Sequence, residues 1–336
     1  MRLRRSDCTG PGFTRRRSGR GFVYLDAAGA RVTDPEVRAR ITDLVIPPAW
    51  QEVWVCPHPR GHIQATGIDA RGRKQYLYHE HWRVRRDQEK FDDMVAFARR
   101  LPRLRERVDA DLAAAPLSQQ QVLAAAVRLL DRGFFRIGGE DYAVENETYG
   151  LATMCKRHVT VTDDLLVFDY PAKHGKRRVQ SVVDADVAAI VLSLRRRRGG
   201  GEELLAYRRG RPWVDVRSGD VNAYIKEAVG RTVSAKDFRT WGATVLAAVS
   251  VAVAEPHVHS MTARRRAVNH AVKEVAHYLG NTPAVARRSY IDPRVFDRFA
   301  DGESIHGALS RLGLEPGAPA IQGAAERAVL RLLEDD

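Results

Sequence analysis

The stretch Ser234–Val253, SAKDFRTWGATVLAAVSVAV, decides the fold of most of the chain. Small and branched apolar residues fill its second half, and Ser234 stands where a serine side chain can cap a helix. We therefore predict a helix over Ala235–Val253, with Lys236 and Arg239 three residues apart on one face. A helix of this length and apolar content predicts a mainly helical domain around it.

The helical pattern recurs on both sides of this stretch. It predicts further helices over residues 91–101, 119–130, 184–195, 220–230, 262–279 and 282–290, the last with Thr282 as its cap and Pro283 in its first turn. One segment, His158–Val183, alternates and is rich in valine, which predicts two or three antiparallel strands. Lys173 would lie at the tip of a hairpin there, where most lysines are merely solvated. Arg195–Gly201 is predicted to be a mobile basic loop.

The amino-terminal part has a strand pattern instead. A hairpin is predicted over Gly21–Val32, followed by a short helix capped by Asp34 with Pro35 at its first position. Three strands are then predicted over residues 52–56, 62–68 and 74–79, the last two joined by a turn at 69–72. The prediction is an α+β chain: a small antiparallel β-rich domain over residues 1–85, then a mainly α-helical domain with a β-hairpin over 86–336. Its end, about 310–336, is acidic.

The charge of the chain has a distinct distribution. Among 336 residues, 55 Lys and Arg oppose 42 Asp and Glu, a formal net charge of +13. The excess lies in two blocks, +8 over residues 1–100 and +11 over 151–300, while 101–150 and 301–336 are slightly acidic. Two domains that each present a basic face to one polyanion would give this pattern, and so would a solvated surface rich in arginine.

Several classes of protein are disfavoured. No apolar run approaches the roughly 18 to 20 residues of a membrane span, and no apolar segment follows the basic amino terminus as in a secretory signal. The three cysteines are scattered, which argues against a disulfide framework or zinc site and favours a cytoplasmic location. There is no phosphate-binding loop and no acidic magnesium cluster. Cys56, His58 and His62 are too few for a metal site to be preferred.

Four separate segments carry residues suited to chemistry. In Phe134–Glu140, FFRIGGE, Arg136 stands between apolar residues and needs an anion, either Glu140 or Glu147 structurally or a phosphate functionally. The others are Lys173 at the hairpin tip, Lys236-x-x-Arg239 on its helix, and Leu279–Tyr290, LGNTPAVARRSY. Taken alone, Tyr290 could equally be a core tyrosine.

In this order, the four segments resemble the type IB DNA topoisomerases, in the small form found in poxviruses and some bacteria. Ile46–Trp50 (IPPAW), His62–Gly67 (HIQATG) and Gly72–His79 (GRKQYLYH) are similar to the DNA-clamping β-domain of that family. The resemblance runs from about residue 20 to about residue 300. Each motif is weak alone, but the set in family order is specific.

The resemblance implies an activity and a role for each residue. Tyr290 would attack a DNA phosphodiester to give a 3′-phosphotyrosyl intermediate, Arg136 and Arg239 would stabilise the phosphoryl oxygens, and Lys173 would protonate the leaving 5′-oxygen. Many relatives have histidine where Asn281 stands, and asparagine can only hydrogen-bond the phosphate.

The same resemblance implies the partner. It would be double-stranded DNA, bound by a monomer closed around the duplex in the nucleoid, with no metal, nucleotide or other cofactor. The residues expected to contact DNA are Arg71, Arg73, Lys74, Gln75, Tyr76, Tyr78 and Lys236, with Tyr76 and Tyr78 on one face of a strand.

Two rival interpretations remain. A tyrosine recombinase uses the same arginine, lysine and tyrosine chemistry, but typically has H-x-x-R where this chain has Lys236-x-x-Arg239, and lacks the amino-terminal motifs. A DNA-binding protein without catalysis is the other, although every catalytic position here carries a competent side chain.

Overall fold

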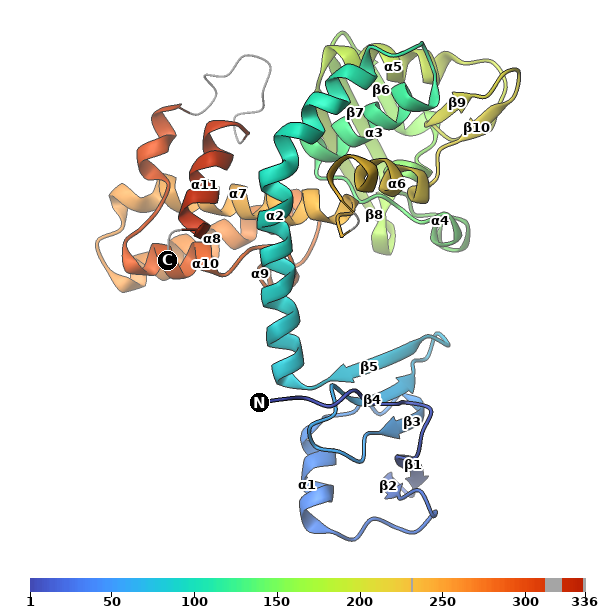
Figure 1. The fold of residues 1–336 in the computed structure, drawn as a ribbon, viewed down its shortest axis with the longest axis vertical. Coiled ribbons are helices and arrows are strands. Elements are labelled where there is room, and N and C mark those ends of the chain that lie inside the picture. The colour runs from blue at the N-terminus through green and yellow to red at the C-terminus, as the bar shows by residue number, and fades with distance from the viewer. Residues whose placement is uncertain (231, 312–321, 335–336) are drawn as a thin grey trace. The chain divides into compact units, whose positions relative to one another are not determined.

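A computed structural model describes residues 1–230, 232–311 and 322–334 (Figure 1). The chain forms two compact units, Met1–Lys90 and Phe91–Asp336. The first holds an antiparallel sheet and the second is mainly helical, which confirms the predicted fold class. No helix within the described ranges is long and apolar enough to cross a bilayer.

The N-terminal unit is built on a five-stranded antiparallel sheet in the order β2-β1-β3-β4-β5. Its strands are β1 (Phe13–Ser18), β2 (Gly21–Leu25), β3 (Gln51–Val55), β4 (Ile63–Ile68) and β5 (Lys74–Tyr78). The Asp34 side chain accepts hydrogen bonds from the first backbone N–H groups of α1 (Pro35–Asp43), so its predicted role as a cap is confirmed. Ile41 of this helix packs with Val53 and Val55 in a small core.

The first hairpin lies earlier than the sequence pattern predicts. β1 pairs with β2 from Thr14 opposite Leu25 to Ser18 opposite Gly21. Beyond β2 the chain turns back, with one antiparallel bridge from Leu25 to Arg31 and a hydrogen bond from the Val32 N–H to the Tyr24 carbonyl at 2.9 Å. The predicted hairpin over 21–32 is therefore present only as β2 and a short return, and the longer pairing of β2 is with β1, which the sequence pattern did not predict. β1 contains three consecutive arginines, so its sequence does not show the alternation of apolar and polar residues that indicates a strand. One of them, Arg15, donates hydrogen bonds to the carbonyls of Pro47 and Trp50.

The residues before β1 are fastened to this sheet. The backbone N–H of Ser6 donates to His62 Nδ1 at 2.8 Å, and the Ser6 hydroxyl donates to the carbonyl of Ile63 at 2.9 Å. The indole of Trp54 donates to the carbonyl of Gly10 at 3.0 Å. The basic amino-terminal residues therefore belong to the N-terminal unit rather than forming a separate tail.

The remaining helices and strands belong to the C-terminal unit. Its first helix, α2, begins at Glu80, ten residues before the end of the N-terminal unit at Lys90. The helices are α2 (Glu80–Leu112), α3 (Gln119–Gly133), α4 (Glu140–Asn146), α5 (Ala185–Arg196), α6 (Ser218–Val229), α7 (Ala235–Ala254), α8 (Met261–Leu279), α9 (Pro283–Ser289), α10 (Arg294–Asp301) and α11 (Ala324–Glu334). The strands are β6 (Val159–Thr162), β7 (Leu165–Ala172) and β8 (Lys176–Val183) in one sheet, and β9 (Ala206–Arg208) with β10 (Trp213–Asp215) in another.

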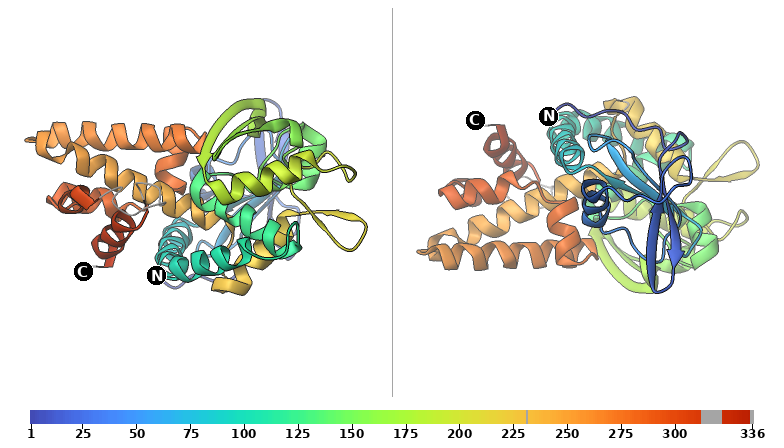
Figure 2. Two further views of the ribbon diagram at one scale, coloured as in Figure 1. Left: turned by 90° about the horizontal axis from the view of Figure 1, so that it is seen from above. Right: turned by 90° about the horizontal axis from the view of Figure 1, so that it is seen from below.

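The long helices form the centre of the C-terminal unit. α7 and α8 lie side by side in both views of Figure 2 and pack on each other. Phe97 of α2 meets Phe238 of α7 edge to face, with ring centroids 5.0 Å apart. The predicted helix over Ala235–Val253 is confirmed to within one residue. Small side chains such as Ala243 and Ala247, fully buried in α7, let its neighbours approach closely.

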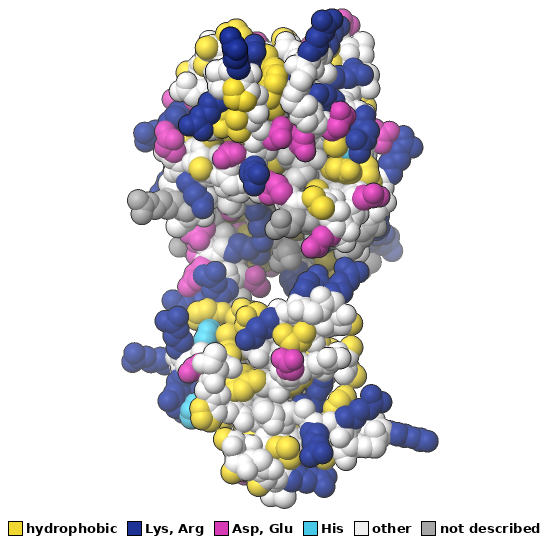
Figure 3. Space-filling view, turned by 90° about the vertical axis from the view of Figure 1, so that its right-hand side faces the viewer, with side chains coloured by type: hydrophobic (Ala, Val, Ile, Leu, Met, Phe, Trp, Pro, Cys, Tyr) yellow, Lys and Arg dark blue, Asp and Glu magenta, His cyan; other side chains and the backbone are white. Residues whose placement is uncertain are grey.

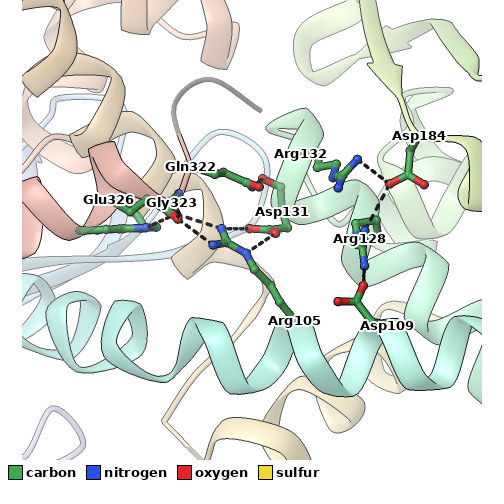
Figure 4. A network of polar contacts seen from close by, with 10 residues as sticks. Arg105, Asp109, Arg128, Asp131, Arg132, Asp184, Gln322, Gly323 and Glu326 are labelled. Carbon is green, nitrogen blue, oxygen red and sulfur yellow. Dashed lines mark hydrogen bonds and ion pairs between the residues drawn. The ribbon is translucent and has the colours of Figure 1, made fainter. Parts of the chain in front are cut away.

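The C-terminal helix α11 is fixed by a buried polar network (Figure 4). The Glu326 carboxylate accepts hydrogen bonds from Arg105 of α2 and, at 2.8 Å, from the indole of Trp241 in α7. Arg105 also pairs with Asp131 of α3 at 2.8 Å. The network therefore joins α11 to three helices of the unit. Parts of the predicted acidic extension, residues 312–321 and 335–336, lie outside the described residues.

The basic loop after α5 differs from its prediction. Arg197 is buried, and its guanidinium donates to the carbonyls of Leu194 and Leu204 at 2.9 and 3.0 Å. It also stacks on the ring of Trp213 at 5.4 Å. One member of the run RRRRGGG is thus a structural residue rather than a solvated one.

Candidate active site

Arg136 lies just beyond the end of α3. Phe134 ends that helix with a left-handed backbone, φ 54°, and turns the chain out of it. Phe135 is fully buried beside it, which anchors the segment. The Nη2 atom of Arg136 donates to the Gly280 carbonyl at 3.1 Å and to the Asn281 side-chain oxygen at 2.5 Å.

The structural partner expected for Arg136 is wrong. Glu140 accepts hydrogen bonds from the backbone and hydroxyl of Ser218 instead, at 2.6 and 3.0 Å. Neither Glu140 nor Glu147 forms an ion pair with Arg136, and no other carboxylate within the described ranges does so. In the part of the chain that the structure describes, no carboxylate therefore pairs with the positive charge of Arg136.

Arg239 is the most deeply buried cation of the site. α7 begins at a capping box in which the backbone N–H of Ser234 donates to the Asp237 carboxylate at 2.7 Å. Two residues later Arg239 is 3% exposed, and it donates to the carbonyl of Phe134 and, at 2.9 Å, to that of Leu279. Lys236, one turn earlier, is exposed. Arg239 thus links the end of α3 to the end of α8.

Three arginines meet at the carbonyl end of α8. Arg178 donates to the carbonyls of His277 and Tyr278, Arg239 to that of Leu279, and Arg136 to that of Gly280. Carbonyls at a helix C-terminus lack most intrahelical donors and carry partial negative charge. Gly280 is left-handed, φ 61°, and ends the helix there. The helix end therefore holds these cations together where no carboxylate does.

Two buried donors at this point have no acceptor. Because the side-chain oxygen of Asn281 accepts from Arg136, its amide nitrogen faces away, and neither this Nδ2 atom nor Nε of Arg239 has a hydrogen-bond partner among the described residues. A buried donor without a partner is costly unless something supplies an acceptor. The arrangement suits an anionic oxygen.

Tyr290 follows α9, which the Thr282 hydroxyl caps by accepting from the Val285 backbone N–H at 3.4 Å. The guanidinium of Arg239 lies 5.3 Å from the centre of the Tyr290 ring. Burial raises the pKa of the Tyr290 hydroxyl, but the charges of Arg239, Arg136 and Lys236 outweigh it, so the pKa is lower than that of an ordinary tyrosine. Burial beside Arg136 also lowers the pKa of Arg239.

Lys173 is exposed at the tip of the β7–β8 hairpin and borders a cleft of about 800 Å³. Arg136 and Asn281 also line this cleft, whereas Arg239 and Tyr290 do not. The charged residues that line it are all basic: Arg132, Arg136, Lys173, Lys176, Arg177 and Arg178. The structure therefore brings Arg136, Asn281 and Lys173 to one cationic cleft, with Arg239 and Tyr290 packed behind the arginine.

The expected DNA-contacting residues of the first unit lie on and beside β5. Tyr76 and Tyr78 are 43% and 42% exposed, and their rings stack with centroids 6.2 Å apart, with Lys74 over Tyr76. Gln75 points to the other face and donates to Asp69 at 2.9 Å. The same carboxylate bonds Arg73, whose hydrogen bonds lower the pKa of Asp69 to about 2. Arg71 is exposed in this turn.

Lys and Arg side chains occur on the surface of both units, as the face in Figure 3 shows. Sequence reasoning missed Arg178 and Gln180, which lie on β8 beside the cleft and contact both helix ends of the site. No signal in the run Lys176-Arg177-Arg178 separates the arginine that turns inward from the one that stays exposed. The register of the hairpin decides it.

Two family models match the chain in order. Residues 21–69 match the N-terminal domain of bacterial DNA topoisomerase IB, and residues 79–302 match the catalytic core of eukaryotic DNA topoisomerase I. A β-rich unit followed by a helical unit with a cationic cleft is thus the architecture of a DNA topoisomerase, an enzyme. More particularly, the chain belongs to the type IB topoisomerase family.

Viral proteins are among its relatives. The chain is 29% identical to DNA topoisomerase 1B of Acanthamoeba polyphaga mimivirus over 83% of its length and 85% of the viral protein. It is 20% identical to DNA topoisomerase I of monkeypox virus and to DNA topoisomerase 1B of vaccinia virus, over 79% of its length and 80% of theirs.

Proposed function

We propose that this enzyme relaxes supercoiled duplex DNA by cutting one strand, allowing it to rotate, and rejoining it through a 3′-phosphotyrosyl intermediate on Tyr290. One observation carries the proposal: Arg136, Asn281 and Arg239 meet, with Arg239 beside the Tyr290 ring, and two buried donors there have no acceptor among the described residues. A DNA phosphate would supply the missing acceptor oxygens.

Tyr290 is the proposed nucleophile. A tyrosine with an ordinary pKa of about 10 is almost wholly protonated at neutral pH. The lowered pKa of Tyr290, caused by the neighbouring cations against the effect of burial, increases the phenolate fraction. Its oxygen forms a bond to phosphorus, its proton passes to solvent, and the bond from phosphorus to the 5′-oxygen breaks.

Arg136 and Arg239 would stabilise the transition state. Negative charge builds on the non-bridging phosphoryl oxygens, and a planar guanidinium can meet two of them. Both arginines are held by carbonyls at the end of α8, which carry only partial charge. A fully charged phosphate would compete well for the same N–H groups. Arg136 already lines the cleft, whereas Arg239 is buried and would have to become accessible to the phosphate. Asn281 would donate through its free amide nitrogen.

Lys173 is the proposed proton donor. The 5′-oxygen is a poor leaving group unless it takes a proton as its bond to phosphorus breaks. Lys173 stands at an exposed tip above the cleft, among other cations, and can give that proton on cleavage and recover it on religation. The phosphotyrosyl bond conserves the energy of the phosphodiester, so religation needs no nucleotide.

DNA binding would involve both units, in a monomer. The exposed tyrosines and Lys74 of β5, with Arg71 and Lys236, would contact the backbone and base edges of one duplex. Such contacts neutralise phosphates and make binding weaken steeply with salt.

Relaxation of a supercoiled plasmid tests the proposal. Because the arginines supply the positive charge at the phosphate, we expect relaxation of both negative and positive supercoils without ATP and in the presence of EDTA. Tyr290→Phe should bind DNA but neither relax it nor form a covalent complex. A strict requirement for ATP or Mg²⁺, or relaxation by the phenylalanine variant, would refute it.

A further inference from the structure

We propose that Arg178, together with Gln180, is a positioning residue that holds the Lys173 hairpin over the cleft. The inference rests on the proposed function, in which Lys173 is the proton donor. The inference goes beyond that function because it names the residues that place the lysine, which lies at the tip of the two-stranded part of the sheet.

The outer half of the hairpin is held mainly on its β7 side, where Tyr170 and Ala172 are buried and the Pro171 carbonyl accepts from the Tyr149 backbone N–H at 2.8 Å, so the support of β8 depends on its own side chains. β7 and β8 pair from Leu165 opposite Val183 to Ala172 opposite Lys176, but β6 pairs only with the inner part of β7, as far as Phe168. Beyond it the ladder is two-stranded, and Lys173, Lys176 and Arg177 at its tip are exposed. An isolated two-stranded hairpin is at best marginally stable in water. Contacts from its base must therefore limit how far the tip can move.

Gln180 joins this base to the segment that carries Arg136. Its side-chain oxygen accepts from the hydroxyl of buried Tyr170 at 2.7 Å and from Nε of Arg178 at 2.9 Å. Its amide nitrogen donates to the carbonyl of Gly133, the last residue of α3. The side chain thus bonds both strands of the hairpin and the helix end three residues before Arg136.

Arg178 joins the same base to the helix end before Asn281. Its two terminal nitrogens donate to the carbonyls of His277, at 3.4 Å, and Tyr278. The side chain lies so close over Gly280 that a Cβ there would come within 2.7 Å of its Nη1 atom. Any larger residue at position 280 would therefore push Arg178 away.

The hydrogen bonds distinguish positioning from phosphate binding. All three guanidinium nitrogens of Arg178 already have acceptors, whereas Nε of Arg239 has none among the described residues. Arg178 is also partly buried, and burial lowers its pKa. A guanidinium that donates from each of its nitrogens to two helix carbonyls and to Gln180 is suited to hold one element against another.

The neighbouring Arg177 is a matched control. It has the same charge, lines the same cleft and sits on the same strand. However, it is exposed, and the partner shown for it among the described residues is Asp169 across the hairpin, at 2.8 Å. Arg177→Ala removes a charge from the cleft without releasing the hairpin from either helix end.

Single-turnover cleavage of two DNA duplexes tests the proposal. One duplex has an ordinary phosphodiester, and the other has sulfur in place of the bridging 5′-oxygen at the cleavage site. A thiol is far more acidic than an alcohol, so a thiolate leaves without a proton donor. The deciding quantity is the rate on the sulfur substrate divided by that on the ordinary one. Lys173→Ala should lose most of its rate on the ordinary duplex and regain it on the sulfur duplex.

Arg178→Ala and Gln180→Ala should behave as weaker versions of Lys173→Ala. A proton donor displaced by about 1 Å costs about 100-fold in rate, so we expect a loss of that order on the ordinary duplex and a ratio raised at least about tenfold. Arg177→Ala should keep the wild-type ratio. Arg178→Lys keeps the charge but not the bond to Gln180. If the alanine variant does not fold, the ratio of the rate on the sulfur duplex to that on the ordinary duplex is measured on Arg178→Lys instead.

The outcomes separate the two proposals. If Lys173→Ala is not restored by sulfur, the proton-donor role fails, and with it this part of the proposed function. If Lys173→Ala is restored but the Arg178 variants lose rate equally on both substrates, or lose none, Arg178 does not position the lysine and the inference alone is overturned.

Discussion

Replacing Glu326 by glutamine should destabilise the C-terminal unit strongly. The Glu326 side chain is only 11% exposed and accepts from Arg105 through both of its oxygens, from the Trp241 indole and from the Gly323 backbone N–H (Figure 4). Four donors converge on two oxygens. In Glu326→Gln one oxygen becomes an NH₂ group, so donors face a donor and the negative charge is lost.

The size of the effect follows from what Arg105 retains. Removing one partner of a buried ion pair costs about 3 to 5 kcal/mol. Arg105 still has Asp131, at 2.8 and 3.0 Å, so its charge is not left alone and the lower end applies, about 3 kcal/mol. For a unit of this size each kcal/mol lowers the melting temperature by about 2 to 4 °C. We expect a fall of about 6 to 12 °C.

Calorimetry of the full chain measures this, with Glu334→Gln as the control. Glu334 lies on the same helix and also pairs with an arginine of α2, Arg99 at 2.7 Å, but 33% and 61% of these side chains are exposed. An exposed pair contributes less than about 1 kcal/mol. Equal shifts for the two variants, or a shift below about 2 °C for Glu326→Gln, would show that the network does not stabilise the unit as reasoned.

Three further predictions concern the site. Arg136→Ala removes a cation that lowers the pKa of Tyr290, so this pKa should rise and the pH profile of cleavage should move to higher pH; an unmoved profile would contradict the electrostatic argument. Lys236→Ala should lower the slope of log affinity against log salt by about one, because Lys236 is exposed and is proposed to contact a DNA phosphate; titrations at several salt concentrations decide this. Its charge also lowers the pKa of Tyr290, so the pH profile of cleavage should move to higher pH, but by less than in Arg136→Ala. Asn281→Ala should slow single-turnover cleavage less than Arg239→Ala does, because it removes one neutral donor rather than a buried charge, and equal losses would count against the supporting role of Asn281.

Most helices could be predicted because their signals are local. Asp34, Ser234 and Thr282 mark helix starts through bonds to residues two or three positions away, and α7 keeps its predicted bounds to within one residue. β1 could not be predicted, because Arg15 reaches carbonyls more than thirty residues distant and is not a solvated charge. Its alternation becomes apparent only beside β2 and β3.

The partner of Arg136 illustrates the same limit. The nearby carboxylates Glu140 and Glu147 were the natural local choices, yet the arginine bonds Gly280 and Asn281, 144 and 145 positions along the chain. The last carbonyls of a helix carry partial negative charge and can bind a cation, whatever residue types supply them. Sequence alone gives no indication that the carbonyls of α8 take that place.

By itself, the sequence determined most of the long helices and which residues could do chemistry, because caps, turns, periodicity and ionisable groups are local properties. Only the tertiary structure decided that three arginines share one helix end, that Arg178 turns inward while Arg177 does not, and that Glu326 accepts from side chains of two other helices, α2 and α7. These are choices among long-range partners. They depend on which backbone carbonyls and side chains the packed structure leaves without hydrogen-bond partners, and on whether a distant side chain lies close enough to bond them.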